Sequence, residues 1–526
     1  MTVVAIDFGT SNTVISILEP DTNTPKTLRF PNISRFFSLP SLESGKETIS
    51  VVPSLVFIKN KEEIFLGEQV RSQRLGFAQP ESLFKGFKRD LAADFRPPSR
   101  QIAGSEYTPE VVAETFLRNI HQQLQQLNIE ATQIIFTIPV GAFERYLDWF
   151  WDLTEKLSLP QVKLVDESTA AALGYAVKRL GSVVLVVDFG GGTLDLSLIR
   201  TTSAKKQDNN AILKAEVIAK SDAYVGGEDI DFWIVEDYLQ QINSSREEVG
   251  EVCWQNLLEL AEKLKIRLSV SQEVKESWFD EDNFMSYELQ LNQDKLAEIL
   301  ENCQLLEQLR NALDEVLTTA FNKGINKSNI EQVVLVGGSC LIPAVQQLIQ
   351  SYFGKNKVKL DKPFQAVSHG ALALNNLEEI SDNLRHSYAI RLWEPFNNSY
   401  SYYTLFPKGT SYPCQREETL ILRVANEGQT EIRLDIGELA EISQGEVEYD
   451  SQGRMTSSHL RKGQEYRSLE STSETVCLAK LNPPGEIGKD RLAVDFTVNE
   501  RRVLLATVTD LLTQEVLWRN QAIAKL

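Results

Sequence analysis

The sequence predicts an α/β domain followed by a separate all-β domain, and three observations support this prediction. Short apolar runs that end in Asp-Phe-Gly alternate with long helical patterns, which is typical of an α/β domain. One such run occurs twice, at residues 3–10 and 185–193. From about residue 387, helical periodicity gives way to short alternating runs separated by polar turns. The expected division is an α/β domain over 1–375, a linker over 376–386 and a β domain over 387–526.

The elements of the first domain are predicted from apolar residues at helical spacing. Helices are expected over 109–127, 144–157, 254–268, 294–321 and 344–353. Pro343 stands just before the last of these, a position that favours a helix start. In the β domain, alternating runs predict strands over 419–424, 431–436, 491–498 and 503–508. In the connector 375–386, Leu377, Ile380 and Leu384 recur at helical spacing, which predicts a short amphipathic segment rather than a flexible Gly/Ser linker.

The internal repeat is the most informative feature of the sequence. The first copy reads VVAIDFGT and the second LVVDFGGGT, with Asp7 and Asp188 at matching positions. Each copy continues into another apolar alternation, at 13–18 and at 194–199. The unit therefore predicts a strand, an acidic Gly-Thr turn and a second strand, which is a β-hairpin with exposed amides at its tip. Two distant copies indicate a duplicated fold with a cleft between its halves.

The predicted hairpin tips suit a phosphate ligand. Glycine lets backbone N–H groups approach a phosphate closely, because no Cβ atom stands in the way. An Asp at the strand end cannot touch the phosphate itself, so it is expected to hold Mg²⁺ through waters. One copy alone would be read as a tight hairpin turn. Two matched copies favour a clamp on a triphosphate.

Two further glycine loops could contribute to the same site. Residues 333–339 form an apolar strand pattern that runs into a glycine pair before a helix, an arrangement that brings an anion to a helix N-terminus. Residues 224–231 place two glycines before acids in the first turn of a predicted helix. Each loop also has an ordinary structural reading, as a strand-to-helix turn or as helix capping.

Composition excludes several classes of protein. The chain has 526 residues with 54 Lys and Arg against 73 Asp and Glu, a net charge of −19. This excess repels nucleic acid and anionic lipid, so neither is an expected partner. The five cysteines, at 253, 303, 340, 414 and 477, form no CxxC pair, which favours a reducing compartment. No apolar run reaches the ~18 residues of a membrane span, and the first residues do not resemble a signal peptide. A cytoplasmic location is expected.

These motifs together resemble those of the seventy-kilodalton heat-shock chaperones of DnaK type, within the actin-like ATPase superfamily. The resemblance runs over residues 1–375 with the signature segments in order. It matches the first phosphate motif at 5–12, the second at 188–195, the connecting segment at 226–231, the adenosine motif at 333–339, the proline switch at 137–139, the relay arginine at Arg145 and the acidic helix cap at 166–172. The resemblance implies an actin-like, duplicated ribonuclease-H-like ATPase domain with a cleft, followed by a small all-β sandwich.

The resemblance also implies the ligands and the residues that hold them. The expected ligands are ATP or ADP with Mg²⁺, and K⁺ is a further candidate ion. Mg²⁺ and its waters would be held by Asp7, Asp188 and Glu167. Catalytic roles are implied for Lys88, Glu167, Asp188 and Thr193. The phosphates would be enclosed by Gly9, Thr10, Ser11, Asn12, Gly190, Gly191, Gly192 and Thr193. Other nucleotide contacts are implied for Gly226, Gly227, Glu228, Glu262, Lys265, Ile266, Ser269, Gly337, Gly338, Ser339 and Leu341.

The assignment of the catalytic lysine leaves an alternative open. Lys88 would orient the attacking water and offset charge on the transferring phosphoryl group. Lys85 competes with it, because the local match requires a one-residue insertion. Either lysine could instead be a solvated surface charge. The same holds for Glu262 and Lys265, since charged residues on a helix are commonly solvent-facing pairs.

The chain departs from the family pattern at several positions. Ile266 and Leu341 stand where two arginines usually enclose the adenine, so the base would keep dispersion contacts but lose cation–π stacking. Arg267 could compensate from the next position. Ser168 replaces a proline after the acidic cap, and Phe364 replaces an acid before the last helix of the domain. None of these changes removes a predicted phosphate or magnesium ligand.

The expected function is that of an ATP-dependent chaperone in which ATP binding and slow hydrolysis gate the capture of extended peptide segments by the β domain. No helical lid is expected after the β domain. A J-domain co-chaperone and a nucleotide-exchange factor are the family's partners, although the altered linker at 376–382 weighs against coupling of that kind.

Three alternatives remain open from the sequence. An actin-like filament-forming ATPase would share the fold and the ATP chemistry, but the β domain and the 166–172 segment argue against it. A sugar or acetate kinase would need its own catalytic base in the cleft, and no further candidate is found. A nucleotide-gated scaffold with one dedicated partner is the third alternative.

Overall fold

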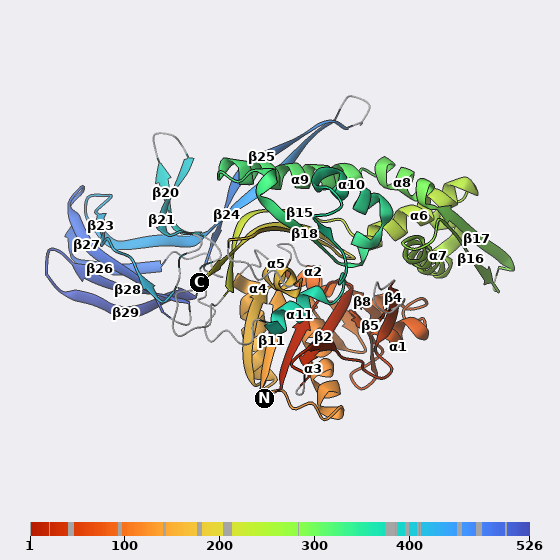
Figure 1. Cartoon of the computed structure of the whole chain (residues 1–526). Helices are drawn as coiled ribbons and strands as arrows, with labels where there is room; N and C mark the ends of the chain where they lie inside the picture. The colour runs from red at the N-terminus through yellow and green to blue at the C-terminus, as the bar shows by residue number, and fades with distance from the viewer. Residues whose placement is uncertain are drawn as a thin grey trace. The chain divides into compact units, whose positions relative to one another are not determined.

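The computed structural model divides into two compact units (Figure 1). The first comprises Met1–Glu378 and the second Glu379–Leu526. The residues that the structure describes are 2–19, 22–39, 47–92, 97–139, 144–175, 181–203, 213–281, 283–373, 384, 387–394, 399–407, 410, 412–449, 455–469, 476–499 and 502–525.

A seven-stranded sheet holds the N-terminal strands of the first unit. Its strands lie in the order β12-β11-β1-β2-β5-β4, and β3 pairs with β2. Their bounds are β1 (Val3–Asp7), β2 (Asn12–Leu18), β3 (Pro25–Thr27), β4 (Arg35–Leu39), β5 (Glu47–Pro53), β11 (Gln133–Ile138) and β12 (Gln161–Asp166). Strand β1 lies between antiparallel β2 and parallel β11, and it is buried on both faces, because Val4 and Ile6 pack into one hydrophobic cluster and Val3 and Ala5 into another. This burial explains why its sequence is an unbroken apolar run.

A five-stranded sheet follows in the same unit, in the order β15-β14-β13-β18-β19. Its strands are β13 (Val183–Phe189), β14 (Leu194–Ser203), β15 (Leu213–Ala223), β18 (Ile330–Val336) and β19 (Val358–Lys359). Here β13 pairs with antiparallel β14 and parallel β18, as β1 does with β2 and β11. Both repeated segments form the predicted hairpins, with Asp7 opposite Val14 and Asp188 opposite Asp195.

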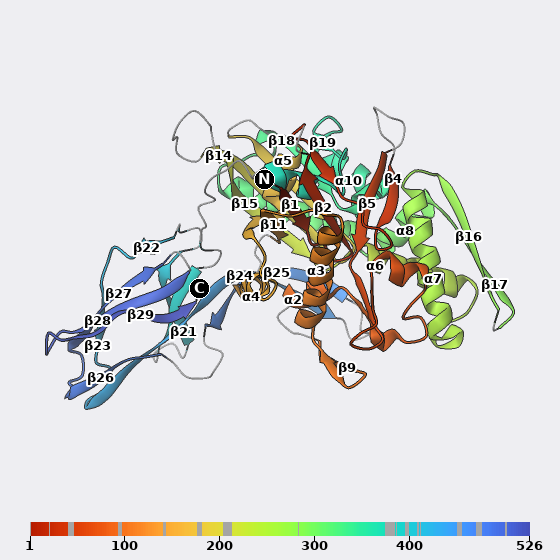
Figure 2. The same ribbon diagram turned by 90° about the horizontal axis from the view of Figure 1, so that it is seen from below.

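Smaller sheets and helices surround these two sheets. The smaller strands are β6 (Leu55–Ile58), β7 (Ile64–Leu66) and β8 (Leu83–Lys85), which form one sheet, and the pairs β9 (Arg100–Ile102) with β10 (Ser105–Tyr107) and β16 (Glu273–Asp280) with β17 (Met285–Asn292). The α-helices are α1 (Glu68–Ser72), α2 (Phe87–Ala92), α3 (Pro109–Gln126), α4 (Glu144–Lys156), α5 (Glu167–Gly174), α6 (Gly227–Gln241), α7 (Arg246–Leu268), α8 (Gln293–Asn302), α9 (Leu305–Asn322), α10 (Pro343–Phe353) and α11 (Ala366–Ala373). Helix α7 lies beside the β16–β17 hairpin in both ribbon views (Figures 1 and 2).

One of the predicted helices is interrupted. The segment expected as one helix over 294–321 forms α8 and α9, because Gln304 adopts a left-handed conformation with φ of 60°. The helix expected over 254–268 is confirmed as the C-terminal part of α7, which begins earlier and has a kink at Gly250, with φ of 75° and ψ of 168°. The helices expected over 109–127, 144–157 and 344–353 are confirmed with small changes at their ends.

Helices α5 and α11 pack directly on each other between the two larger sheets. A Cβ atom on Gly370 would lie 1.7 Å from the carbonyl oxygen of Ala170, and one on Gly174 would lie 1.9 Å from that of Ala366. Only glycine allows so close an approach, since any side chain would overlap backbone atoms. This packing fixes the position of Glu167, the first residue of α5.

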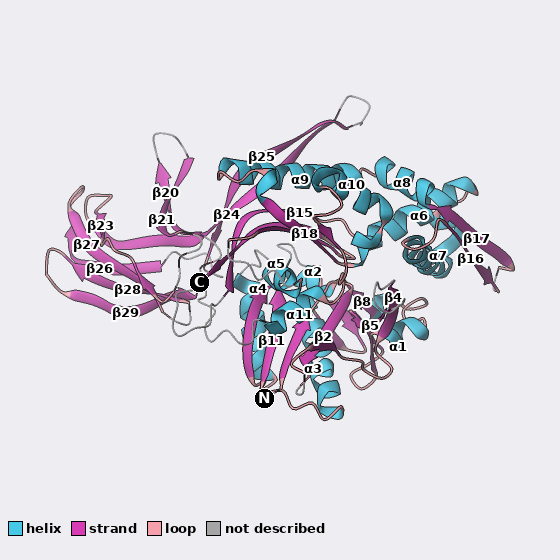
Figure 3. Ribbon diagram, viewed as in Figure 1, coloured by secondary structure: helices cyan, strands magenta, loops and turns pink. Residues whose placement is uncertain are grey.

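The second unit is built from antiparallel strands only, within its described residues (Figure 3). One sheet has the order β21-β20-β24-β25 with β26 beside β24, and the other has the order β22-β27-β28-β29 with β23 beside β27. The strands are β20 (Ser387–Glu394), β21 (Ser399–Phe406), β22 (Cys414–Gln415), β23 (Leu420–Arg423), β24 (Gln429–Tyr449), β25 (Met455–Ser468), β26 (Val476–Gly485), β27 (Asp490–Val498), β28 (Val503–Asp510) and β29 (Val516–Lys525). Buried residues of both sheets, among them Ile390, Ile436 and Phe496, form one hydrophobic core.

Most of the predicted linker lies outside the described residues. Leu377 and Ile380 belong to that part, so their expected helical segment stays a prediction. Leu384 is described, and it is buried in the core of the second unit. No helix within the described ranges is both long and apolar enough to cross a lipid bilayer.

Candidate functional site

The first unit contains a cleft of about 1120 Å³. It is lined by residues of both hairpin tips, of β4, α1 and α7, and of the segment that follows β18. Of the residues predicted from the sequence, the cleft is lined by Thr10, Ser11, Asn12, Gly190, Gly191, Gly227, Glu228, Glu262, Lys265, Ile266, Ser269, Gly338, Ser339 and Leu341. The remaining predicted residues do not line it directly; these are Asp7, Gly9, Lys88, Glu167, Asp188, Gly192, Thr193, Gly226 and Gly337.

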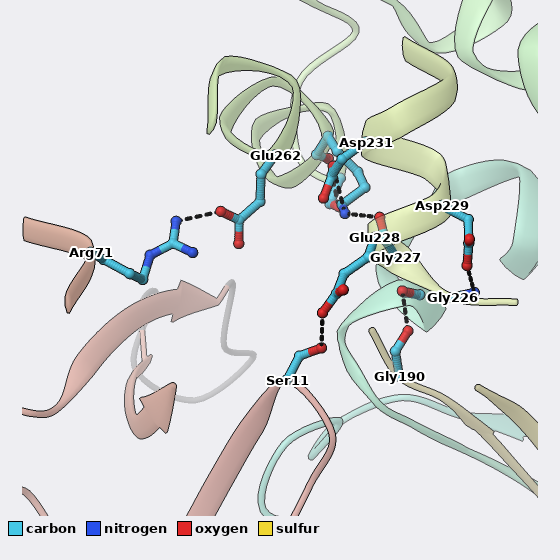
Figure 4. A network of polar contacts seen from close by, with 12 residues as sticks. Ser11, Arg71, Gly190, Gly226, Gly227, Glu228, Asp229, Asp231 and Glu262 are labelled. Carbon is cyan, nitrogen blue, oxygen red and sulfur yellow. Dashed lines mark hydrogen bonds and ion pairs between the residues drawn. The ribbon is translucent and has the colours of Figure 1, made fainter. Parts of the chain in front are cut away.

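The two hairpin tips meet at this cleft (Figure 4). The Ser11 hydroxyl, from the first tip, donates a hydrogen bond of 2.9 Å to the Glu228 carboxylate at the start of α6. The backbone N–H of Glu228 donates in turn to the carbonyl oxygen of Gly191 in the second tip, at 2.9 Å. A Cβ atom on Gly191 would lie 1.9 Å from the Ser11 hydroxyl oxygen. The tips are therefore close enough for both to contact one small ligand.

Glycines let the second tip and the start of α6 lie backbone to backbone. A Cβ atom on Gly226 would lie 2.3 Å from the carbonyl carbon of Gly191. The N–H of Gly227 donates to the carbonyl oxygen of Gly190 at 3.1 Å, and the Asp229 carboxylate accepts from the N–H of Gly226 at 2.8 Å. The predicted acidic first turn of α6 is thus observed, with Asp229 as its cap.

The segment after β18 reaches the second tip. The Ser339 hydroxyl donates to the carbonyl oxygen of Gly190 at 2.8 Å. Gly337 has φ of 85°, and a Cβ atom there would lie 2.3 Å from the carbonyl oxygen of Phe189. The predicted glycine pair leads from β18 into a short 3-10 turn over Gly338–Leu341, and α10 begins at Pro343, one residue before its predicted start.

A group of carboxylates surrounds one buried lysine near the tips. The Lys88 ammonium lies 2.7 Å from the Glu167 carboxylate, and the Thr137 hydroxyl donates to the Asp7 carboxylate at 2.8 Å. The charges of Asp7, Asp188 and Glu167 act on one another. Lys88 is 7% exposed and does not line the cleft, whereas Lys85 is exposed and does.

The pKa values in this group reflect crowded acids. Desolvation and the charge of Glu167 raise the pKa of Asp7 to about 7, and Lys88 opposes part of this rise. Desolvation and the charges of Glu167 and Asp195 raise the pKa of Asp188 well above its usual range. Desolvation likewise raises the pKa of Asp195 to about 6, while a hydrogen bond from Thr193 opposes the change. The site therefore has more negative charge than one lysine balances.

These carboxylates suit a hard divalent cation. Crowded carboxylates with raised pKa values are stabilised in their ionised form by a cation that binds among them, and oxygen donors are what Mg²⁺ prefers. Within the described ranges, no three His, Cys, Asp or Glu side chains are arranged for direct metal coordination. The negative charge and the oxygen donors of this group fit Mg²⁺.

Glu262 of α7 is paired with two arginines from other elements. Its carboxylate lies 2.7 Å from Arg35 of β4 and also pairs with Arg71 of α1 (Figure 4). Although desolvation opposes it, the charges of the two arginines lower the pKa of Glu262 to about 2. Glu262 is therefore not a solvent-facing residue of a surface pair. Sequence reasoning did not identify either arginine, because ion pairs between distant elements leave no local pattern.

The next residues of α7 complete this side of the cleft. The Lys265 ammonium lies 2.7 Å from the Asp231 carboxylate and donates to the carbonyl oxygen of Gly227 at 2.5 Å. Ile266 and Leu341 line the cleft, as does Arg267, whose guanidinium pairs with Glu276. Arg267 is therefore already engaged by a carboxylate.

An aromatic pair also lines the cleft and was not predicted. Phe37 of β4 stacks on Phe364, with ring centroids 4.9 Å apart and an interplanar angle of 6°. The Arg35 guanidinium lies 4.7 Å above the Phe37 ring. Phe364 also contacts the segment after β18, since a Cβ atom on Gly338 would lie 3.2 Å from its ring. The sequence marked Phe364 only as a departure from a motif and gave no sign of its partner.

Some residues named from the sequence have other surroundings or are not described. Gly9 is held by the Ser54 hydroxyl, which donates to its carbonyl oxygen at 2.7 Å. The side chain of Arg145 lies outside the described residues. Thr137, named from the sequence only as part of a switch segment, contacts Asp7 directly.

Comparison with known proteins gives one family match and several similar chains. A model of the Hsp70 protein family matches residues 94–378, more than half of this chain. Proteins named chaperone protein DnaK from Thermotoga petrophila and Thermotoga maritima are 28% identical over 380 residues. That of Thermosipho melanesiensis is 27% identical over 381 residues. These alignments cover 70% of this chain and 58% of each relative. The chain therefore spans less than two thirds of the length of the curated relatives that it matches.

Proposed function

Because this chain belongs to the Hsp70 family, whose N-terminal domain is an actin-like ATPase, we propose that its first unit binds ATP with Mg²⁺ and hydrolyses it slowly. The observation that carries this proposal is the meeting of the two hairpin tips through Ser11, Gly191 and Glu228. Two glycine-rich tips on one cleft present backbone N–H groups to a phosphate chain from two sides. The shared strand order of the two sheets supports a duplicated, ribonuclease-H-like origin for this arrangement.

The phosphates would lie between the tips. Thr10, Ser11 and Asn12 would contact them from the first tip, and Gly190, Gly191, Gly192 and Thr193 from the second. The charge of the cleft supports an anionic ligand, although the chain as a whole is strongly acidic. Its lining residues include the cations Arg35, Arg71, Lys85, Lys265, Arg267 and Lys362 against the acids Glu228, Asp231, Glu259, Glu262 and Asp361.

Asp7, Asp188 and Glu167 would hold Mg²⁺ through waters. The ion would supply positive charge that neutralises the phosphate oxygens. Lys88 is better placed than Lys85 to act on the reaction, because it bonds Glu167 and its charge acts on Asp7. In this role it would orient the attacking water and balance charge that develops on the phosphoryl group.

The nucleoside would lie along α7 and the segment after β18. Ile266 and Leu341 would contact the two faces of the adenine through dispersion. Glu262, Lys265 and Ser269 would face the ribose and the base. Because Glu262 already pairs with Arg35 and Arg71, a ribose hydroxyl would share this carboxylate with the arginines or displace them.

The second unit is proposed to be a β-sandwich that binds extended polypeptide segments under control of the nucleotide. Two antiparallel sheets that share one core support the sandwich. The family match favours a chaperone over a filament-forming ATPase or a dedicated scaffold. J-domain proteins and exchange factors are the candidate partners in this proposal.

The experiment that tests the ATPase proposal combines calorimetry with single-turnover hydrolysis of Mg-ATP. We expect the wild-type protein to bind ATP and ADP and to release phosphate. In Gly191→Ala, the new methyl group would meet the Ser11 hydroxyl, so phosphate binding should be lost. Ser11→Ala, which removes that hydroxyl without adding an atom, should weaken binding less. A wild-type protein that binds neither nucleotide contradicts the proposal.

A further inference from the structure

Arg89 of α2 places its guanidinium where the two hairpin tips meet. The position of a Cβ atom on Gly192 lies 3.7 Å from Arg89 Nη1 and 3.0 Å from Thr10 Cγ2. Gly192 belongs to the second tip and Thr10 to the first. The guanidinium therefore lies beside the turn that would enclose the terminal phosphates, and it comes from a third element.

Within the described part of the chain, no ion pair neutralises the charge of Arg89. Arg89 is exposed, and within the described ranges no carboxylate lies within ion-pair distance of its guanidinium. Desolvation raises the pKa of Asp90, the next residue in the chain, and the charge of Arg89 opposes only part of this rise. Its other neighbour, Lys88, is buried and bonded to Glu167 at 2.7 Å. Of the two consecutive cations on α2, one is paired and the other is available to an anion.

We propose that Arg89 is a second catalytic cation, which contacts the γ-phosphate of ATP and stabilises the charge of the transferring phosphoryl group. This role rests on the proposed ATPase function. In the reaction, the water oxygen forms a bond to the γ-phosphorus while the bond to the β–γ bridging oxygen breaks. The electron pair leaves with ADP, and the protons of the water pass to the released phosphate and to solvent. Negative charge accumulates on the oxygens that Arg89 would face.

The carboxylates around Lys88 favour a second cation for the phosphate. Asp7, Glu167 and Asp188 stand around this lysine, so most of its charge is offset before a nucleotide arrives. No carboxylate of the described residues pairs with Arg89, so its charge can act on the phosphate. Its planar guanidinium group can donate two parallel hydrogen bonds to phosphate oxygens. Arginines that stabilise the charge of phosphoryl transfer in this way raise turnover by orders of magnitude.

The test compares Arg89→Ala and Arg89→Lys with the wild-type chain. Arg118→Ala, which removes an exposed arginine of α3 that pairs with Glu114 and does not line the cleft, serves as the control. We expect Arg89→Ala to lower the single-turnover hydrolysis rate at least tenfold, while the Kd for ADP, which has no γ-phosphate, changes less than twofold. The affinity for ADP with aluminium fluoride, a mimic of the transferring phosphoryl group, should fall by the same factor as the rate. Arg89→Lys should recover part of both losses, and Arg118→Ala should behave as wild type.

Three other results would contradict the proposed role of Arg89. If Arg89→Ala hydrolyses ATP at the wild-type rate, the role of Arg89 is refuted and the ATPase proposal stands. If the variant loses ADP affinity as strongly as it loses rate, Arg89 supports the shape of the site and is not a catalytic cation. A wild-type chain that binds or hydrolyses no ATP refutes the proposed function, and the role of Arg89 with it.

Discussion

Lys88 and Lys85 stand three residues apart in the sequence but have different surroundings in the fold. Both carry the same charge in one short segment, and the sequence match could be drawn through either of them. The fold separates them, because β8 ends at Lys85 and α2 turns Lys88 toward α5. Lys88 is bonded to Glu167, and Lys85 remains exposed at the cleft. The sequence predicted that a lysine of this segment acts in the site, and the proposal that it is Lys88 rests on the tertiary contact with Glu167.

Replacing Lys88 by Ala should lower ATP turnover at least tenfold, which corresponds to about 1.4 kcal/mol of barrier. ATP affinity should change much less, since the effect arises in the transition state. Single-turnover kinetics and calorimetry measure the two quantities separately. Lys85→Ala is the matched control and should retain most of the rate. If instead Lys85→Ala abolishes turnover and Lys88→Ala does not, the assignment must be exchanged.

Asp7 makes the stability of the nucleotide-free protein depend on pH. The pKa of this carboxyl is about 7 in the folded protein and near 3.8 in the unfolded chain, so the folded state binds more protons between these values. The free energy of unfolding therefore falls as pH rises from about 4 to about 7. Asp7→Asn should raise stability at pH 8 without Mg²⁺, by an amount on the order of 1–2 kcal/mol.

Thermal unfolding at pH 5 and pH 8 measures this effect. The exposed Asp152 supplies the control, since Asp152→Asn should leave the pH dependence of wild type unchanged. The slope should become shallower in Asp7→Asn without vanishing, because the pKa values of Asp188 and Asp195 are also raised. An equal slope in wild type and Asp7→Asn would show that other groups produce the pH dependence.

The hairpins are the elements that the sequence predicted most fully. Each is a local structure whose two strands and turn lie within 21 residues, so the apolar alternation and the glycines specify it directly. The break between α8 and α9 was missed for the opposite reason. Apolar spacing continues through it, and neither glycine nor proline marks Gln304, whose left-handed conformation starts the new helix. The partners of Glu262 were missed because β4 and α1 are far from α7 in the sequence.

The hairpin of β27 and β28 is stabilised by a buried ion pair. The Arg491 guanidinium lies 2.8 Å from the Asp510 carboxylate, and these side chains are 4% and 3% exposed. Asp510 also accepts hydrogen bonds from the backbone N–H groups of Leu512 and Thr513. Its removal would leave a buried arginine without a counter-charge. Asp510→Ala should therefore lower the free energy of unfolding of the second unit by about 3–5 kcal/mol.

Asp490, at the start of β27, offers a matched control for this substitution. It pairs with Arg423 at 2.7 Å, but both side chains are at least half exposed. Asp490→Ala should change stability by less than about 1 kcal/mol, as is usual for surface pairs. Urea unfolding of the two variants of the full chain measures the difference. Equal losses in both would mean that the burial of the Arg491 pair has no energetic consequence.

At the scale of the whole molecule, the sequence predicted two structural parts joined by a linker over 376–386. The chain divides into its two compact units between Glu378 and Glu379, inside this predicted linker, while the change to alternating patterns comes near 387. The sequence pattern changes where the type of secondary structure changes. A compact unit ends where the tertiary contacts of its residues end. Leu384 illustrates the difference, since it precedes the first β-strand of the second unit yet is buried in that unit's core.

Because the chain forms two compact units, we expect two thermal unfolding transitions. Mg-ATP or Mg-ADP at about one hundred times its Kd should stabilise the first unit by about 2.7 kcal/mol and leave the second unchanged. Differential scanning calorimetry of the full chain, with and without nucleotide, would then show one transition rising and one fixed. The Asp510→Ala variant identifies the transition of the second unit, because only that one should fall. If nucleotide raises both transitions equally, the units unfold as one.

The contacts of Arg35 and Phe37 imply that the cleft responds to its solvent in two opposite ways. On β4, Arg35 pairs with Glu262, and Phe37, two residues on, stacks with Phe364. Dissolved chloride salts screen the partly exposed charges, while the aromatic stack weakens on cooling. Sulfate strengthens apolar burial at the same time as it screens charge. These contacts between β4, α7 and Phe364 should therefore be strongest when the protein is warm and at low ionic strength, and weakest in cold, chloride-rich solution.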